Sequence, residues 1–237
     1  MPNPSPGRSG ALAWTSPADW VWSCWGVGRG RQLVKKGFRL RLETRYPEAE
    51  DVKLTAVAAR PESLALRLRI PGWLRRSAVV KLNGQPLEGT PSAGSYLELT
   101  RVWRAGDMLE ARFPMDLSAE VMPDDPKVQA YLYGPLVLAG DLGAEGLTEA
   151  HIIGPNFRVG APGVEQHGSP LAPTNQVPPV PDLEIPILRP RGADPASWIK
   201  PADSPLTFRT TGQQRDVTLV PLYRLFDRRY AVYWEVA

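Results

Sequence analysis

Few residues in this sequence could act as nucleophiles or metal ligands. The 237 residues include one cysteine, Cys24, and two histidines, His151 and His167. A single cysteine forms no intramolecular disulfide, and a structural Cys/His zinc site needs about four ligands. Both histidines lie in an irregular stretch, where a lone histidine is usually solvated. The sequence therefore predicts no catalytic residue, no cofactor-binding residue and no metal ligand in this chain.

The carboxylate residues lie in expected turns or on the solvent-facing sides of expected strands. Asp107, Asp124 and Asp125 fall in expected turns, whereas Glu98 and Glu110 alternate outward on expected strands. Asp107 is expected to bond to the backbone of its own turn. Two outward carboxylates could still meet in space and act as acid and base, and the sequence leaves that alternative open.

Two tryptophans, Trp73 and Trp103, could offer flat surfaces on which a sugar ring stacks, because each stands beside a turn at the end of an expected strand. A buried aromatic side chain contributes much to packing. We therefore favour a plug in the core or between domains for both, with carbohydrate contact as the alternative. Arg69 and Arg101 are expected to pair with carboxylates across a sheet, a contact worth little where it is exposed.

Composition favours a folded chain with many turns. Hydrophobic residues make up 43% of the sequence, with 26 prolines and 21 glycines. Proline is excluded from helix interiors and central strands because it lacks the N–H donor and fixes φ. We therefore expect short strands and irregular connections rather than long helices.

Charge and hydropathy argue against two classes of partner. The net charge is +3, and the basic residues stand in pairs such as Arg75-Arg76 and Arg228-Arg229. These pairs are shorter than the 5–8-residue runs that indicate nucleic-acid binding. No apolar run approaches the ~20 residues of a membrane helix, and no signal peptide is visible at the N-terminus. We expect no nucleic-acid or membrane partner, and a cytoplasmic location unless an export signal belonged to a missing upstream part.

Alternation of apolar and polar residues predicts an antiparallel β-sandwich over residues 37–127. Asn83-Gly84, after the apolar Val80 and Leu82, is a strong hairpin signal because both turn residues accept positive φ. The strands expected in this half are 38–43, 52–56, 64–70, 80–82, 97–99 and 109–117.

Residues 128–237 are expected to form a smaller β-rich domain. Residues 128–139 are almost wholly apolar and predict a strand buried on both faces, broken at Gly134-Pro135. Residues 141–203 are rich in proline and glycine, and a structureless loop of that length is uncommon inside a compact domain. The short elements expected in this half are a helical turn at 145–151 and strands at 183–188, 206–210, 217–221 and 230–236.

Residues 1–36 differ from the rest of the chain. They hold four of the eight tryptophans among proline, glycine, serine and arginine, and no period of 2 or 3.6 persists. We interpret them as an irregular, poorly ordered arm, or as sequence that did not evolve with the fold that follows. A tryptophan-rich binding patch is the alternative.

Five stretches in a fixed order carry a resemblance. They are LRLRIPGW (66–73), LNG (82–84), RVWRAGD (101–107), YGPLVLA (133–139), and VPLY (220–223) with YAVYW (230–234). Together they resemble glycoside hydrolase family 127, whose named activity is removal of β-L-arabinofuranose. The similarity covers residues 37 to 237 and leaves the first 36 unmatched.

The resemblance implies an α/α helical barrel that holds the chemistry, followed by β-sandwich domains. It also implies a thiolate nucleophile, a glutamate acid/base and a zinc ion held by three cysteines and a glutamate, all in the barrel. None of these can be placed here, since Cys24 in SCWGVG does not match the family's paired-cysteine motif. No cofactor is therefore expected in this chain, and zinc is expected only in the missing barrel.

The sequence thus predicts an all-β chain that is the non-catalytic, C-terminal part of a β-L-arabinofuranosidase-like enzyme. Its expected partner is the catalytic barrel domain or a second copy of the chain, on surfaces that would otherwise be left exposed. Three alternatives remain open. They are a stand-alone module that binds arabinose-containing glycans, an enzyme completed by a separate barrel chain, and the remnant of an interrupted glycosidase gene.

Overall fold

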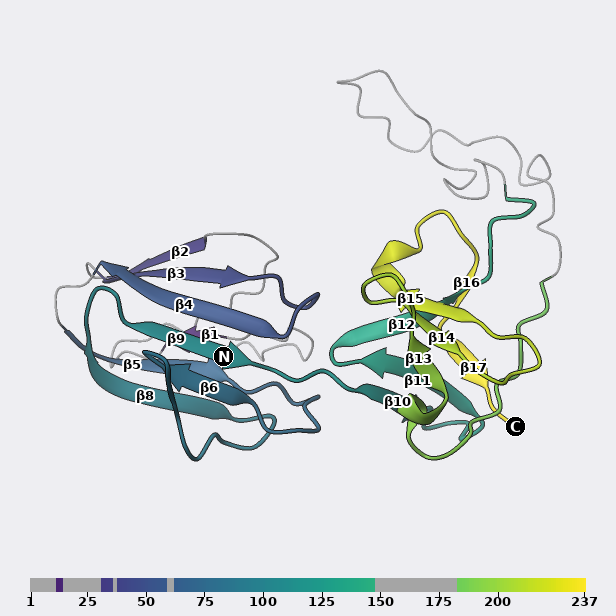
Figure 1. Ribbon diagram of the computed structural model, residues 1–237, viewed down its shortest axis with the longest axis horizontal. Helices are drawn as coiled ribbons and strands as arrows, with labels where there is room; N and C mark the ends of the chain where they lie inside the picture. Colours follow the sequence, from purple (N-terminus) through teal and green to yellow (C-terminus); the bar gives the residue numbers. More distant parts are fainter. Residues whose placement is uncertain (1–11, 15–30, 36–37, 59–61, 148–182) are drawn as a thin grey trace, which may run out of the picture. The chain divides into compact units, whose positions relative to one another are not determined.

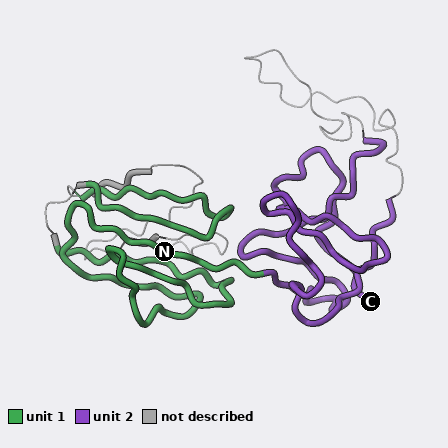
Figure 2. The backbone as a smooth tube through the Cα atoms, in the orientation of Figure 1, with its two compact units in different colours: residues 1–116 green, residues 117–237 purple. Residues whose placement is uncertain are grey.

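The computed structural model describes residues 12–14, 31–35, 38–58, 62–147 and 183–237. Within these residues the chain is almost entirely β, with two short 3-10 helices (Figure 1). No helix among them is long and apolar enough to cross a membrane. The chain divides into two compact units, residues 1–116 and 117–237 (Figure 2). The all-β fold class expected from the sequence is confirmed.

The first unit is a sandwich of two antiparallel sheets. The larger has the order β2 (Arg31–Lys35), β3 (Phe38–Thr44), β4 (Asp51–Ala58), β9 (Met108–Arg112), β6 (Val79–Leu82) and β7 (Gln85–Pro86). The smaller has the order β1 (Leu12–Trp14), β5 (Glu62–Arg69) and β8 (Tyr96–Trp103). The inner faces of the two sheets meet, since the rings of Phe38 and Trp103 lie 6.5 Å apart between their centroids.

The predicted period of two is the basis of this sandwich. On β3 the apolar side chains of Phe38, Leu40 and Leu42 are buried, while Arg39 and Arg41 between them are exposed. Successive side chains of a strand point to opposite faces. Burying each apolar side chain stabilises the fold by about 1.5–3 kcal/mol before conformational entropy is counted.

The strand predicted over 109–117 is wrong, because it is two strands in different sheets. β9 ends at Arg112, and β10 (Leu117–Val121) pairs with β11 of the second unit. Pro114 between them has no N–H to give to a ladder. The N–H of Phe113 donates instead to the carbonyl of Glu50 (2.9 Å) and that of Met115 to its carboxylate (2.9 Å). The second unit thus begins at residue 117, whereas the sequence pattern predicted that the second domain begins at 128.

The second unit is built on one antiparallel sheet of eight strands within the described residues. Its main order is β10, β11 (Val128–Tyr133), β12 (Leu136–Asp141), β15 (Thr218–Pro221), β14 (Phe208–Thr210) and β13 (Ile199–Pro201). β16 (Tyr230–Ala231) pairs with β12, and β17 (Tyr233–Glu235) pairs with β11. The apolar run over 128–139, predicted to break at Gly134-Pro135, forms the hairpin of β11 and β12. Gly134 in the turn of this hairpin has a φ of 55°.

The core of the second unit lies around large aromatic side chains. Trp198 and Trp234 are 1% and 0% exposed, and the ring of Tyr131 meets that of Trp198 edge-on at 5.3 Å. Gly140 of β12 lies directly beneath Trp234, where no Cβ would fit. The three late strands predicted from the sequence are confirmed as β14, β15 and the pair β16 and β17.

The proline-rich stretch is only partly as predicted. The strand expected at 183–188 is wrong, because only an isolated bridge from Leu188 to Val236 forms there. Two elements that the sequence did not indicate, η2 (Pro195–Ser197) and β13, end this stretch. η3 (Leu222–Arg224) follows β15. Part of the helical turn expected at 145–151, and both histidines, lie outside the described residues.

Two pieces of the predicted N-terminal arm are strands. β1 pairs with β5 in the smaller sheet, and β2 pairs with β3 in the larger one. The expectation of an irregular arm is therefore wrong for residues 12–14 and 31–35, because strands so short show no detectable period. The rest of residues 1–36, Cys24 included, lies outside the described part.

Candidate functional site

Trp103 is a core residue. It is 1% exposed, and its indole N–H donates to the carbonyl of Leu64 at 3.0 Å. The guanidinium of Arg101 lies 5.4 Å from the centre of its ring, within the range of a cation–π contact. With its faces covered, Trp103 takes the position of the expected plug and has no free face for a sugar ring.

Trp73 belongs to an aromatic cluster of the first unit. Its ring is stacked on that of Tyr46, with centroids 6.3 Å apart, and Tyr46 in turn meets Phe113 edge-on at 6.4 Å. Burial raises the pKa of Tyr46 well above its ordinary value, and the indole N–H of Trp73 opposes this only in part. Trp73 itself is half-buried, so one side of it is packed against the core and some of it reaches the surface.

Asp107 joins two turns. Its carboxylate accepts from the backbone N–H of Arg104 and from the side-chain amide of Asn83, both at 2.8 Å, and it pairs with Arg101 at 3.5 Å. Burial acts to raise the pKa of Asp107. The hydrogen bonds from Arg104 and Asn83 and the charges of Arg101 and Arg104 outweigh it and lower the pKa below its usual value. The expected bond to its own turn is confirmed.

Asn83 makes a contact that the sequence did not indicate. Its side-chain oxygen accepts from the N–H of Met108 at 2.7 Å while its amide donates to Asp107. Asn83 has a φ of 50°, the conformation that the hairpin signal requires. One side chain therefore ties the β6–β7 hairpin to the turn before β9.

The arginine pairs predicted across the sheet are wrong. Arg101 pairs with Asp107, which lies in the turn after its own strand and not across the sheet. Arg69 lies over the ring of Tyr96, 4.8 Å from its centre, and has no carboxylate partner among the described residues. The cross-strand ion pair is made instead by Arg67 with Glu98 at 2.6 Å. Arg67 and Arg69 both point outward from β5, and only the register decides which of them faces the glutamate.

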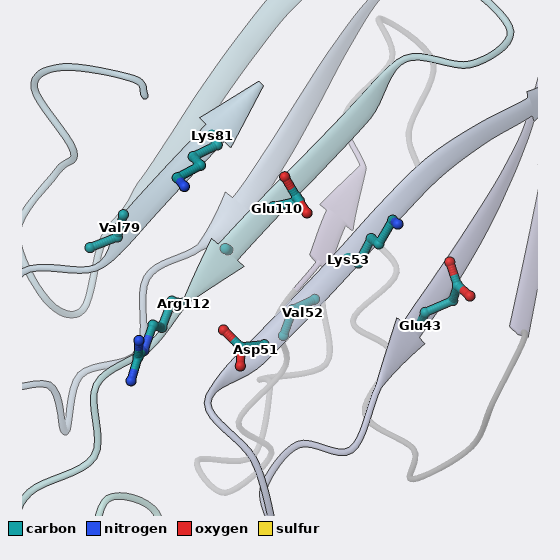
Figure 3. Close-up of a pocket in the computed structure, with 9 residues that line it drawn as sticks. Glu43, Asp51, Val52, Lys53, Val79, Lys81, Glu110 and Arg112 are labelled. Carbon is teal, nitrogen blue, oxygen red and sulfur yellow. The ribbon is translucent and has the colours of Figure 1, made fainter. Parts of the chain in front are cut away.

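A shallow groove of about 460 Å³ crosses the outer face of the larger sheet of the first unit (Figure 3). Four side chains of alternating charge form a row across four strands there. The register aligns Glu43 of β3 with Lys53 of β4, Lys53 with Glu110 of β9, and Glu110 with Lys81 of β6. We call these four residues the charged row. A second row aligns Asp51 with Arg112, whose guanidinium bonds to Glu50 at 2.7 Å.

The charged row offers hydrogen-bond acceptors and donors in turn. Glu43 and Glu110 are two strands apart, so their backbones are separated by about 10 Å at ~4.8 Å per strand. A lysine stands between them, and both carboxylates project from an outer sheet face rather than into an enclosed pocket. The carboxyl pair of a glycosidase flanks the scissile bond in a pocket. The groove therefore does not supply the arrangement that sugar hydrolysis commonly requires.

Metal-binding geometry does not occur in the part of the chain that the structure describes. No group of three histidine, cysteine, aspartate or glutamate side chains there could hold a metal ion. The described residues therefore offer no site for the zinc implied by the resemblance. Cys24, His151 and His167 lie outside the described residues.

The two compact units match two sequence profiles. Residues 30–115 match the middle domain of glycoside hydrolase family 127, described as β-L-arabinofuranosidase, and residues 118–236 match a domain of unknown function. The chain therefore contains a glycoside hydrolase family 127 segment. The middle-domain match begins at residue 30, before the start inferred from the sequence, and so takes in β2.

A curated relative of this chain is much longer than it is. A non-reducing end β-L-arabinofuranosidase of Bifidobacterium longum subsp. longum is 29% identical over an alignment of 160 residues, and the match covers 55% of this chain and 24% of that protein. The chain thus spans about a quarter of the length of that relative.

Solved structures agree on the fold. A family 127 β-L-arabinofuranosidase from Geobacillus stearothermophilus T6 aligns with 87% of this chain and 32% of its own, at 19% identity and a TM-score of 0.53. A second β-arabinofuranosidase of the family aligns with 88% of this chain and 33% of its own, at 20% identity and a TM-score of 0.55. At this identity the alignments establish the shared fold and leave activity open.

Proposed function

We propose that this chain is the non-catalytic β-sandwich part of a β-L-arabinofuranosidase-like glycoside hydrolase. Its role is to brace a catalytic α/α barrel, which carries the nucleophile, the acid/base and the zinc ion. The chain supplies rigid sheets against which that barrel is held, and it takes no part in bond cleavage.

The observation that carries this proposal is what the family motifs do in the fold. Trp103 fills the core, and Asp107 and Asn83 join two turns through short hydrogen bonds. A residue whose polar atoms are already satisfied by its own backbone and neighbours has little capacity left for substrate. The motifs therefore support a structural role for this region.

The chemistry of the described residues supports the same conclusion. The charged row lies in an open groove rather than an enclosed pocket, and no cluster in the described ranges suits a metal. Several basic side chains are engaged with carboxylates, including Arg67 with Glu98 and Arg228 with Asp141 at 2.7 Å. Such neutralised pairs do not make the basic patch that nucleic-acid binding needs.

An activity assay tests the proposal. The purified chain is incubated with a chromogenic β-L-arabinofuranoside, alone and mixed with a separately produced helical barrel of a family 127 relative. We expect no hydrolysis by the chain alone, together with an increase in the thermal stability of the barrel on mixing. Hydrolysis by the chain alone that is lost in Glu110→Gln would overturn the proposal.

A binding titration with arabino-oligosaccharides accompanies the assay. The proposal expects no change in the spectrum of the chain at millimolar sugar. Saturable binding that is lost in Trp73→Ala but kept in Tyr96→Ala, with both variants folded, would instead establish a carbohydrate-binding module. Trp73 suits this comparison because part of it reaches the surface.

A further inference from the structure

Asn83 is the one asparagine of this chain that is followed by glycine. The others, Asn3, Asn156 and Asn175, precede proline, phenylalanine and glutamine. An asparagine before glycine loses its side-chain amide more readily than before other residues, because glycine has no Cβ beside the backbone nitrogen that attacks the amide. Asn83 and Gly84 are both exposed, so the water that the reaction consumes can reach them.

The reaction is an attack of the chain on its own side chain, followed by hydrolysis. The backbone nitrogen of Gly84 forms a bond to Cγ of Asn83, the bond from Cγ to Nδ2 breaks, and Nδ2 leaves as ammonia with the proton of the Gly84 N–H. The product is a cyclic succinimide. Water then opens the ring. Addition at Cγ leaves aspartate, and addition at the backbone carbonyl leaves isoaspartate, in which the chain continues through the former side chain.

The folded chain holds Asn83 in a geometry that opposes this ring closure. Its side-chain oxygen accepts from the N–H of Met108 at 2.7 Å and its amide donates to Asp107 at 2.8 Å, so the side chain is held against the turn before β9. Asn83 and Gly84 have φ values of 50° and 80°, as in a type I′ turn. The first central residue of that turn also has a positive ψ. A positive ψ turns the next nitrogen to the far side of the Cα–C bond from Cβ, where it cannot reach Cγ.

We propose that Asn83 is a site of spontaneous deamidation, protected while the β6–β7 hairpin is closed and reactive when the hairpin opens. Proteins open locally as well as globally, and an opened turn frees both the side chain and the backbone of Asn83. The loss of ammonia makes each conversion permanent. The proposal does not depend on the function proposed above, since it concerns the covalent chemistry of one turn and not the role of the chain in an enzyme.

Deamidation removes the contact that protected the site. An aspartate at position 83 places a carboxylate oxygen where the amide donated to Asp107, and two carboxylates at hydrogen-bond distance disfavour each other's ionised form. An isoaspartate adds a backbone atom to the turn, so the register that pairs Leu82 with Gln85 is lost. The first unit therefore does not regain its original stability after the turn has reacted.

The test compares the full chain kept folded with the full chain unfolded in urea, at the same mildly alkaline pH. Digestion and fragment mass spectrometry follow the peptide that holds Asn83, with the mass gain placed at Asn83 rather than at Gln85. We expect the unfolded chain to react at least about tenfold faster, because the folded chain reacts only through opening. In the unfolded chain, Gly84→Ala should slow the reaction at least about tenfold, because its Cβ shields the attacking nitrogen. Equal rates in the folded and unfolded chain would overturn the proposal, and so would an unfolded chain in which Asn83 does not react.

A pair of variants tests the consequence for the fold. Asn83→Asp reproduces one product of the reaction, and we expect the midpoint of the first-unit transition on heating to fall by at least about 4 °C. The double variant of Asn83→Asp with Asp107→Asn should recover most of that loss, because an amide and a carboxylate again face each other between the two turns. An Asn83→Asp chain that melts with the original, or a loss that the double variant does not relieve, would contradict the proposed damage.

Discussion

Removal of the Asp107 carboxylate tests whether the two joined turns hold the sandwich together. In Asp107→Ala the backbone N–H of Arg104 and the side-chain amide of Asn83 both lose an acceptor at 2.8 Å. A hydrogen bond to a charged group contributes about 1.5–3 kcal/mol net. Asp107 is 9% exposed but lies close to the surface, where water can partly replace its contacts. We therefore expect a loss of about 3 kcal/mol, at the low end for two such bonds.

The assay is urea unfolding of the whole chain, followed by tryptophan fluorescence. Trp73 and Trp103 report on the first unit, whereas Trp198 and Trp234 report on the second. We expect the midpoint of the first-unit transition to fall while the second-unit transition keeps its position. The control is Asp125→Ala, an exposed turn carboxylate that accepts one bond, from the N–H of Lys127 at 2.9 Å.

The loss should also depend on pH with a definite sign. The pKa of Asp107 is lowered in the folded chain, so its contribution is present above the ordinary aspartate range and is lost as pH falls through the folded pKa. The difference between the original chain and Asp107→Ala should be constant near neutral pH and shrink below that range. A loss no larger than that of Asp125→Ala, or one independent of pH, would refute this role of Asp107.

Two further substitutions test the core of the second unit and the segment between β9 and β10. Gly140→Ala drives a Cβ into Trp234 and brings it to 2.9 Å from Val217. Because overpacking of that kind costs about 1–3 kcal/mol, calorimetry should show a loss of stability of that size. Gly72→Ala is the neutral control. Glu50→Ala removes the acceptor of the Met115 N–H, so hydrogen exchange at that amide should accelerate, and an unchanged rate would contradict the role given to Glu50.

Much of the fold could be predicted because two-residue alternation is visible in the sequence itself. Phe38, Leu40 and Leu42 are spaced so that only a strand buries them all on one face. The hairpin at Asn83 could be predicted equally well, because few residue types accept a positive φ. Both signals are local, and local signals are what a single sequence displays most directly.

The failures arise where tertiary contacts override a local pattern. Apolar residues alternate from Leu109 to Leu117, yet the chain changes sheets within that run. Pro114 was the available signal, because a residue without an N–H interrupts a ladder. The bond from Met115 to Glu50, distant in the sequence, completes the change and could not be read from it. The short strands β1 and β2 were missed for a related reason, since their pairing comes from the edges of β5 and β3.

The residues that carried the family resemblance identify a fold rather than a site. Trp103, Asp107 and Asn83 belong to recognisable motifs because the core and the turns need those residue types. Function resides in sites placed on folds, and the contacts of these three residues lie within the first unit. A family assignment from such motifs is sound, while a catalytic role inferred from them would not be.

The charged row could not be predicted because it depends on register. Each of its residues is outward on its own strand, but their alignment joins positions as far apart as Glu43 and Glu110. A slip of one residue would turn Lys53 into the core and Leu54 out of it. The register that buries Leu54 and Leu109 opposite each other therefore also aligns Lys53 with Glu110. The core thus fixes the order of charges on the outer face.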